Sequence, residues 1–210
     1  MSEETPRLYL ATPLVDAPET FLPHLRAALE AADVASLLLR LRTSDPAEAE
    51  SAIRAVAAIA QPSDVAVVVE GEADLVIRSG ADGLHVTRGE EQLGGALARL
   101  SPDYIVGAGA LSDRDDAMRA GEAGADYVLF GEAGADDPAP SAEDVLERTR
   151  WWAEIFNTPC VALARRLDEI GPLAEAGADF VMVGEAIWND PRGPADAMRD
   201  AASRLAARTP

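Results

Sequence analysis

The sequence predicts a (β/α)8 TIM barrel formed by one domain over residues 1–210, and three observations lead to this prediction. Eight short apolar runs recur along the chain, with helical segments between them. The runs do not alternate strictly between apolar and polar residues, which is typical of strands buried on both faces of a parallel sheet. Eight strand–helix units in a chain of 210 residues fit a closed barrel better than an open doubly wound sheet, which commonly has five or six strands.

The expected strands are rich in Val, Leu and Ile. In order, they cover residues 8–11, 35–42, 65–70, 83–87, 104–109, 127–131, 160–164 and 180–184. The expected helices cover residues 18–32, 46–60, 72–79, 90–100, 113–122, 142–156, 167–176 and 194–207. The first of these helices places Phe21, Leu25 and Leu29 on one apolar stripe. The second begins after Asp45, a good N-cap residue, with a proline directly behind it.

A Gly-Ala-Asp repeat at residues 80–82, 124–126 and 177–179 supports the barrel. Each glycine follows an expected helix and can take the left-handed conformation that ends a helix. Each aspartate leads directly into a strand, at the end of the barrel opposite the usual site. We therefore expect Asp82, Asp126 and Asp179 to serve stability rather than chemistry.

The composition excludes several classes of function. The chain has 42 alanines and no lysine, so all 18 basic residues are arginine, and no lysine can form a Schiff base or bind phosphate in a P-loop. The net charge of −19 argues against nucleic acid or an anionic membrane as a partner. No signal peptide or membrane-length apolar stretch is seen, which predicts a cytoplasmic protein. We expect the single cysteine, Cys160, to be a buried strand thiol.

Candidate site residues lie where strands end, because a barrel of this kind builds its site there. Arg40 and Arg42 have the same parity in the second strand, so both guanidiniums could enter the barrel and hold phosphate or carboxylate. The alternative is that they pair with nearby carboxylates. Glu70 and Glu90 follow neighbouring strands and could share a divalent cation, or Glu90 could instead cap a helix.

Three further features stand at the same end of the barrel. His85 lies inside an apolar strand, where an interior histidine with satisfied hydrogen bonds is the simpler interpretation. The fifth strand ends in Gly107-Ala-Gly109, whose backbone amides could hold an anion. The loop of residues 132–140, which begins with Glu132, has an unusual composition and follows the sixth strand.

Several of these segments resemble the thiamine phosphate synthase and thiazole tautomerase superfamily over nearly the whole chain. The resemblance rests on the Leu-Arg-Leu-Arg strand at residues 39–42, on residues 79–86 and 124–131, and on residues 159–164 followed by 175–184. The family's synthase joins a pyrimidine diphosphate to a thiazole phosphate, with Mg²⁺ and loss of pyrophosphate. The resemblance implies the same barrel fold and a magnesium-dependent transferase of thiamine biosynthesis.

The resemblance also implies roles for particular residues. Substrate and pyrophosphate binding would fall to Arg40, Arg42, Gly109, Arg165 and Gly184, and metal binding to Glu70 and Glu90. Glu132 takes the position of the tautomerase histidine, so Glu132 and His85 are the catalytic candidates. Burial in an apolar barrel mouth would raise the pKa of Glu132 and suit it to moving protons.

The chain departs from the family pattern at several contacts. Gly71 stands where the family has a magnesium-binding aspartate, Arg165 replaces a glycine of a phosphate loop, and Glu185 replaces a serine of the last phosphate loop. The lysine of the loop after the sixth strand is absent. Losing one charged transition-state contact typically costs about 2.7–4 kcal/mol. Ordinary synthase activity is therefore not expected unless the site has been rebuilt.

Three interpretations remain open. The chain is a synthase of an unusual branch, an enzyme of the same fold acting on a less phosphorylated substrate, or a non-catalytic protein that binds a ligand or a partner. In each case the expected ligand is a small phosphorylated or carboxylate compound. The sequence allows a homodimer and does not decide it.

Overall fold

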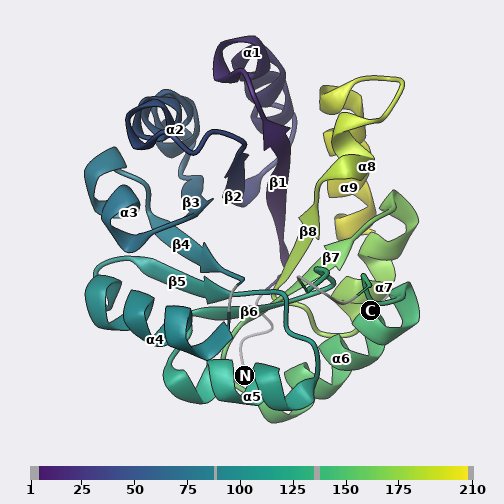
Figure 1. The fold of residues 1–210 in the computed structure, drawn as a ribbon. Helices are drawn as coiled ribbons and strands as arrows, with labels where there is room; N and C mark the ends of the chain where they lie inside the picture. Colours follow the sequence, from purple (N-terminus) through teal and green to yellow (C-terminus); the bar gives the residue numbers. More distant parts are fainter. Residues whose placement is uncertain (1–4, 88, 135–137, 208–210) are drawn as a thin grey trace.

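The computed structural model describes residues 5–87, 89–134 and 138–207, and Figure 1 shows its strands arranged around one axis. Eight parallel strands pair in chain order, and β8 pairs with β1, so the sheet is a closed barrel. The strands are β1 (Arg7–Val15), β2 (Val34–Leu41), β3 (Ala66–Glu70), β4 (Gly83–Val86), β5 (Ile105–Ala108), β6 (Tyr127–Phe130), β7 (Cys160–Ala164) and β8 (Phe180–Val183).

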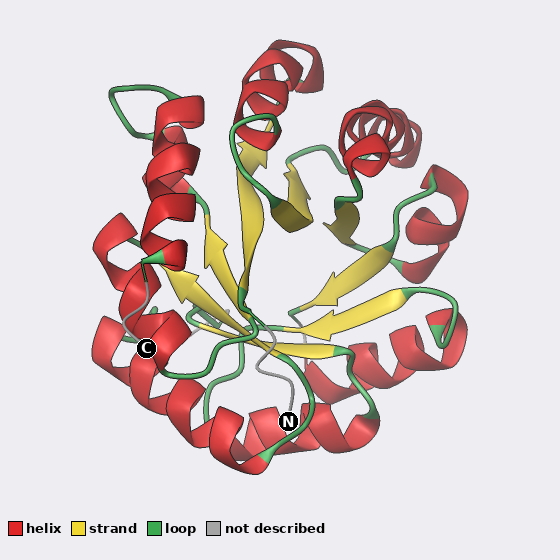
Figure 2. Ribbon diagram, turned by 180° about the vertical axis from the view of Figure 1, so that it is seen from behind, coloured by secondary structure: helices red, strands yellow, loops and turns green. Residues whose placement is uncertain are grey.

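Helices form a ring around the strands, as Figure 2 shows from behind. They are α1 (Pro18–Leu29), α2 (Pro46–Ala60), α3 (Ala73–Ser79), α4 (Gly89–Leu100), α5 (Arg114–Ala123), α6 (Ala142–Ile155), α7 (Ile170–Glu175), α8 (Glu185–Trp188) and α9 (Pro194–Ala206), with 3-10 turns η1 (Gln61–Ser63) and η2 (Leu167–Glu169). The predicted (β/α)8 TIM barrel is confirmed.

Three differences from the expected elements concern one strand end and two short helical segments. The strand expected at residues 8–11 continues as β1 to Val15, through a register irregularity between Ala11 and Leu14 in its pairing with β2. The helix expected at residues 167–176 is divided into η2 and α7. The four-residue helix α8 was not expected, because four residues are too few to show a helical repeat.

The apolar side chains form two layers, one on each side of the barrel wall. Alternate residues of the strands point into the lumen, where Tyr9, Leu38, Val68, Tyr127 and Met182 are buried together. The other side chains of the strands pack against the surrounding helices in a larger cluster. Because both faces of the sheet are buried, the strands read as unbroken apolar runs.

The Gly-Ala-Asp repeat builds the floor of the barrel, as predicted. Asp82 accepts a hydrogen bond from the backbone amide of Val67 at 2.6 Å and donates its own amide to the Val67 carbonyl at 2.8 Å. Asp126 makes the same pair of contacts with Val106, and Asp179 makes them with Cys160. Each carboxylate therefore satisfies a strand amide that would otherwise lack a partner.

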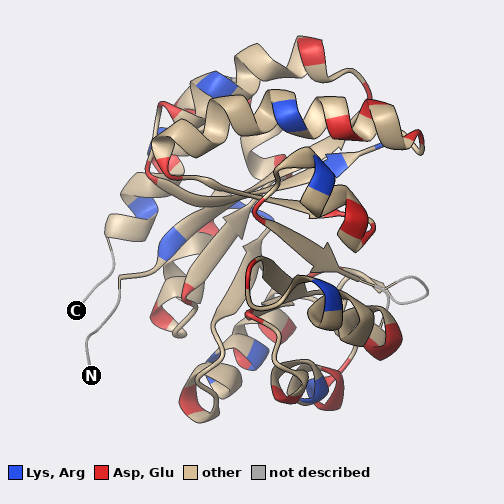
Figure 3. Ribbon diagram, turned by 90° about the vertical axis from the view of Figure 1, so that its left-hand side faces the viewer, with Lys and Arg blue, Asp and Glu red and all other residues tan. Residues whose placement is uncertain are grey.

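The charge of the molecule lies mainly on its outside. Figure 3 shows acidic and arginine segments interspersed over the outer helices and loops. None of the helices in the described parts of the chain is both long and apolar enough to span a membrane. Cys160 is fully buried, and burial raises the pKa of its thiol to about 12, so the expected buried strand thiol is confirmed.

Candidate functional site

A cavity of about 700 Å³ lies at the mouth of the barrel, where the strands end. This volume is within the range of pockets that hold small ligands. Its charged lining residues are Arg40 from β2, Glu70 from β3, Glu132 after β6, Arg165 after β7 and Glu185 after β8. Strands that are far apart in the sequence therefore supply one site together, as in other barrels of this fold.

Arg40 is held between two carboxylates. Its Nε donates to Glu70 Oε1 at 2.9 Å, and one of its terminal nitrogens donates to Glu132 Oε1. The backbone amide of Arg40 also donates to the hydroxyl of Thr12 at 3.0 Å. The counter-charge that an arginine in the lumen requires is therefore supplied by the chain itself.

Arg42 does not join Arg40, and this corrects the expectation that both enter the lumen. Its guanidinium pairs with Asp16, both side chains are more than half exposed, and Arg42 does not line the mouth cavity. The parity argument fails because β2 ends at Leu41, one residue before Arg42. Beyond the end of the strand, alternation no longer fixes the direction of a side chain.

Glu132 and His85 form a buried pair. Their side chains are 6% and 0% exposed, and His85 Nε2 lies 2.8 Å from Glu132 Oε2. Burial raises the pKa of Glu132, but its contact with His85, the Arg40 guanidinium and the Ala110 amide outweigh burial and lower it. The expected rise in this pKa is therefore wrong. Glu132 is ionised near neutral pH and can act as a proton acceptor.

The glycines at the end of β5 provide room for this pair. A Cβ atom at Gly109 would lie 2.1 Å from Glu132 Oε2 and 2.4 Å from His85 Nε2. Ala110 follows with a left-handed φ of 52°, a conformation that is strained for alanine, and its amide donates to Glu132. Gly109 thus accommodates two side chains, which is a different role from the expected binding of an anion by its amide.

Two tyrosines that were not predicted to belong to the site add further polar groups in the lumen. The Tyr127 hydroxyl lies 2.8 Å from His85 Nδ1 and 3.0 Å from the hydroxyl of Tyr9. Both tyrosines are buried. Their positions in the sequence could have indicated this, because the alternation of side chains along β1 and β6 places Tyr9 and Tyr127 on the lumen-facing side.

Glu70 and Glu90 are not brought together. Glu70 faces Arg40 in the mouth cavity, whereas Glu90 pairs with Arg119 and lines a separate cavity between the β4 and β5 loops. Among the residues that the structure describes, no group of three or more His, Cys, Asp or Glu side chains is placed to hold a metal ion. These residues as they stand do not fit a magnesium site.

The loops after β7 and β8 differ from an open phosphate site. The guanidinium of Arg165 donates to the carbonyls of Gly131 and Pro140, at 2.7 Å for Gly131, and so ties the β7 end to both ends of the loop after β6. Gly184 caps α8 through its carbonyl, which accepts from the amide of Ile187 at 2.8 Å. Glu185 adds a carboxylate to the cavity wall.

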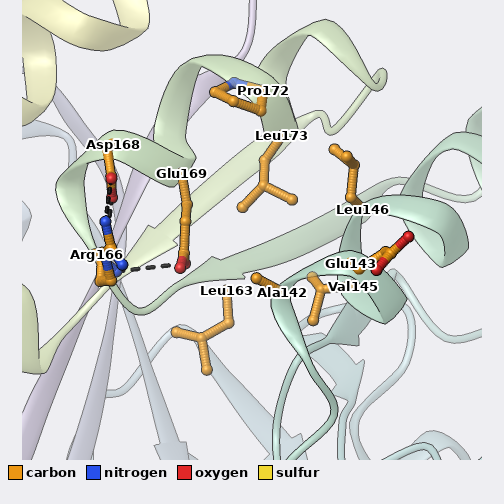
Figure 4. A pocket seen from close by; sticks show the side chains of 10 residues that line it. All are labelled: Ala142, Glu143, Val145, Leu146, Leu163, Arg166, Asp168, Glu169, Pro172 and Leu173. Carbon is orange, nitrogen blue, oxygen red and sulfur yellow. Dashed lines mark hydrogen bonds and ion pairs between the residues drawn. The ribbon is translucent and has the colours of Figure 1, made fainter.

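A third pocket, of about 340 Å³, lies outside the barrel between α6 and α7 (Figure 4). Its wall is mainly apolar and includes Leu146, Leu163 and Leu173. Its arginine, Arg166, pairs with Asp168. The polar groups that could do chemistry are gathered in the mouth cavity instead.

Similarity to known proteins agrees with this fold. Residues 8–187 match the family model described as thiamine monophosphate synthase. The chain is 40% identical over 198 residues to the thiamine-phosphate synthase of Rhodospirillum centenum, covering 92% of this chain and 95% of that protein. It is also 40% identical over 203 residues to the thiamine-phosphate synthase of Hyphomonas neptunium, covering 92% and 90%.

Two solved structures are similar in fold. Thiamine phosphate pyrophosphorylase from Pyrococcus furiosus matches with a TM-score of 0.80 and 21% identity, over 97% of this chain and 96% of that chain. The 3-hexulose-6-phosphate synthase from Salmonella typhimurium matches with a TM-score of 0.74 and 17% identity, over 97% and 100%. At these identities the likeness concerns the fold alone.

Proposed function

Because the chain belongs to the thiamine monophosphate synthase family, we propose that its barrel mouth binds a small ligand of thiamine metabolism that carries less negative charge than a synthase's substrates. In this proposal the chain is a divergent member of the family, with the contacts to phosphate largely replaced. Arg40 anchors one anionic or electronegative group of the ligand. Glu132, supported by His85, is the acid–base group.

The observation that carries this proposal is the pairing of Arg40 with Glu70 and Glu132. A diphosphate needs cations that are free to meet it. Among the described residues of the cavity wall, three carboxylates face two guanidiniums. Arg40 contacts two of those carboxylates, and Arg165 donates to two backbone carbonyls. A doubly phosphorylated pair of substrates would be repelled by this wall, whereas a ring with N–H donors would be attracted to Glu70 and Glu185.

The test is calorimetric titration with matched pairs of compounds: the pyrimidine alcohol against its diphosphate, and the thiazole alcohol against its phosphate. We expect each alcohol to bind at least about tenfold more tightly than its phosphorylated counterpart. Thiazole phosphate should bind no more tightly than about millimolar, near −4 kcal/mol. Glu185→Gln serves as the matched variant. It removes one carboxylate from the wall, so the difference in affinity between each alcohol and its phosphorylated counterpart should become smaller. Micromolar binding of thiazole phosphate would contradict the proposal.

The synthase reaction itself is the second candidate, and the whole-chain similarity to proteins named thiamine-phosphate synthase supports it. It is tested by supplying the pyrimidine diphosphate and thiazole phosphate together with Mg²⁺ and measuring release of pyrophosphate. Turnover that Arg40→Ala abolishes would establish the synthase and exclude the less phosphorylated ligand. A chain that binds the alcohols without any turnover would instead be the non-catalytic member of the family.

A further inference from the structure

The deepest polar groups of the lumen form one continuous chain of hydrogen bonds. Tyr9 on β1 meets Tyr127 on β6, Tyr127 meets His85 on β4, and His85 meets Glu132 after β6. The rings of His85 and Tyr127 are stacked, with centroids 5.7 Å apart and planes 9° from parallel. The ring of Tyr9 meets the ring of Tyr127 at 74°.

The direction of these hydrogen bonds follows from counting protons. Tyr127 is the only partner that the described residues give to the buried hydroxyl of Tyr9. Burial raises the pKa of both phenols, so both keep their protons near neutral pH. The Tyr9 proton must therefore go to the Tyr127 oxygen, and the Tyr127 proton must go to His85 Nδ1.

The opposite direction leaves a proton without an acceptor. If His85 carried a proton on Nδ1, that proton would be donated to Tyr127, and Tyr127 would then donate to Tyr9. The Tyr9 hydroxyl would be left as a buried donor with no partner, which is costly in free energy. The tyrosines thus oppose a proton on Nδ1 and oppose the imidazolium form of His85.

We propose that Tyr127, with its direction fixed by Tyr9, is a positioning residue that holds His85 neutral with its proton on Nε2. The proton on Nε2 is donated to Glu132 Oε2, while Arg40 from β2 donates to Oε1 and the Ala110 amide adds a third donor. Glu70 from β3 balances Arg40 on its other side. Glu132 is then the group that accepts a proton in the mouth, and His85 orients it.

Gly107, two residues before Gly109, also leaves room for the hydrogen-bonded chain. A Cβ atom at Gly107 would lie 2.0 Å from Cζ of Tyr127. A Cβ atom at Gly109 would meet Glu132 and His85, so the two glycines together leave room for three of the four members of the hydrogen-bonded chain. Any larger residue at either position would displace one member of it.

The inference rests on the proposed function only in taking Glu132 as the group that meets the ligand. Its test therefore uses the full chain without ligand, labelled with ¹⁵N-histidine and observed by long-range ¹H–¹⁵N NMR. The chain has two histidines, and His24→Gln assigns the signals of His85. We expect a protonated Nε2 and an unprotonated, hydrogen-bonded Nδ1 near neutral pH. A proton on Nδ1 in the unmodified protein would overturn the proposal.

Two substitutions of the same kind separate a positioning role from simple packing. Tyr9→Phe is the matched control, because Tyr127 can still donate to His85, so the Nδ1 signal should keep its position. Tyr127→Phe should move that signal to the position of an imine nitrogen without a donor, or to that of a protonated nitrogen. The double variant Tyr9→Phe/Tyr127→Phe removes the stranded hydroxyl of Tyr9 and should show the same movement. An unchanged Nδ1 signal in a folded Tyr127 variant would overturn the proposal.

Failure of this inference and failure of the proposed function are distinguishable. The NMR signals depend on the protons of the lumen and not on any ligand. Calorimetry could find no ligand while the spectrum shows the expected tautomer, and the positioning role would stand. Calorimetry could equally find the expected ligand while Nδ1 carries a proton, and only the positioning role would then be lost.

Discussion

Two carboxylates, those of Glu70 and Glu132, hold Arg40 at the mouth of the barrel, and Glu132 is nearly fully buried. We expect Arg40→Ala to lower the free energy of unfolding by about 2 kcal/mol, because a buried charged group loses one of its donors. The loss stays below the ~3–5 kcal/mol of a fully broken buried pair, since Glu132 keeps His85 and the Ala110 amide. Chemical denaturation of the ligand-free protein measures it.

Arg42→Ala is the control for that experiment. Arg42 and Asp16 are an exposed pair, so their loss should cost less than about 1 kcal/mol. If Arg40→Ala left stability unchanged or raised it, the carboxylates would not be the structural partners of Arg40. A ligand anion would then be the partner that the arginine requires.

Substitution of Gly109 tests whether this glycine is needed to leave space for Glu132 and His85 or only for its backbone flexibility. Gly109→Ala should destabilise the protein by about 1–3 kcal/mol, because the added methyl group overlaps both side chains. Gly95→Ala is the control, since this glycine lies in α4 with open space around it, and alanine there should stabilise by up to about 1 kcal/mol. Thermal unfolding compares the two. Equal stability of Gly109→Ala and the unmodified protein would contradict the clearance argument.

At the scale of single residues, the sequence predicted which residues lie at the mouth better than it predicted where their side chains point and which partners they contact. Arg40, Glu70 and Glu132 lie at the mouth, as expected from the strands that they end or follow. The partners of Arg42 could not be predicted, because they depend on where β2 stops. The lowered pKa of Glu132 depends on three groups from three other elements, which no local pattern reveals.

At the scale of elements, the aspartates of the barrel floor act as clamps on strand amides. Asp126→Ala should lower the free energy of unfolding by about 1–2 kcal/mol, because the amide of Val106 loses its acceptor. Hydrogen exchange at Val106 should become faster in the same variant. Asp103→Ala is the control, since Asp103 is exposed at the same end and makes no side-chain hydrogen bond within the described residues. Similar losses in both variants would argue against a clamp.

The elements themselves were largely predictable. Strands buried on both faces are apolar without interruption, so all eight could be recognised, and helix ends were marked by Asp45 and by glycine. What the pattern missed was short or irregular. Helix α8 has four residues, and β1 passes Pro13 through an irregular register, and neither feature produces a repeat that a window of sequence can detect.

At the scale of the whole molecule, the net charge of −19 opposes the compact state. We expect the free energy of unfolding to rise with salt, because the Debye length falls from about 30 Å at 0.01 M to about 8 Å at 0.15 M. Thermal unfolding in sodium chloride measures this, and sucrose at equal osmolarity is the control for effects of the solute. A melting temperature that falls with salt would mean that the arginine–carboxylate pairs outweigh the repulsion.

The clamps of the barrel floor recur before every second strand, joining β3 with β4, β5 with β6 and β7 with β8. Between β1 and β2 the corresponding place holds an exposed contact, from Arg7 to Asp33. Three of the four successive strand pairs are thus fastened at the base by a carboxylate that accepts from a strand amide, and the first pair by an exposed ion pair. At the floor, separating β1 from β2 therefore breaks an exposed ion pair, whereas separating the strands of any of the other three pairs leaves a strand amide without its acceptor.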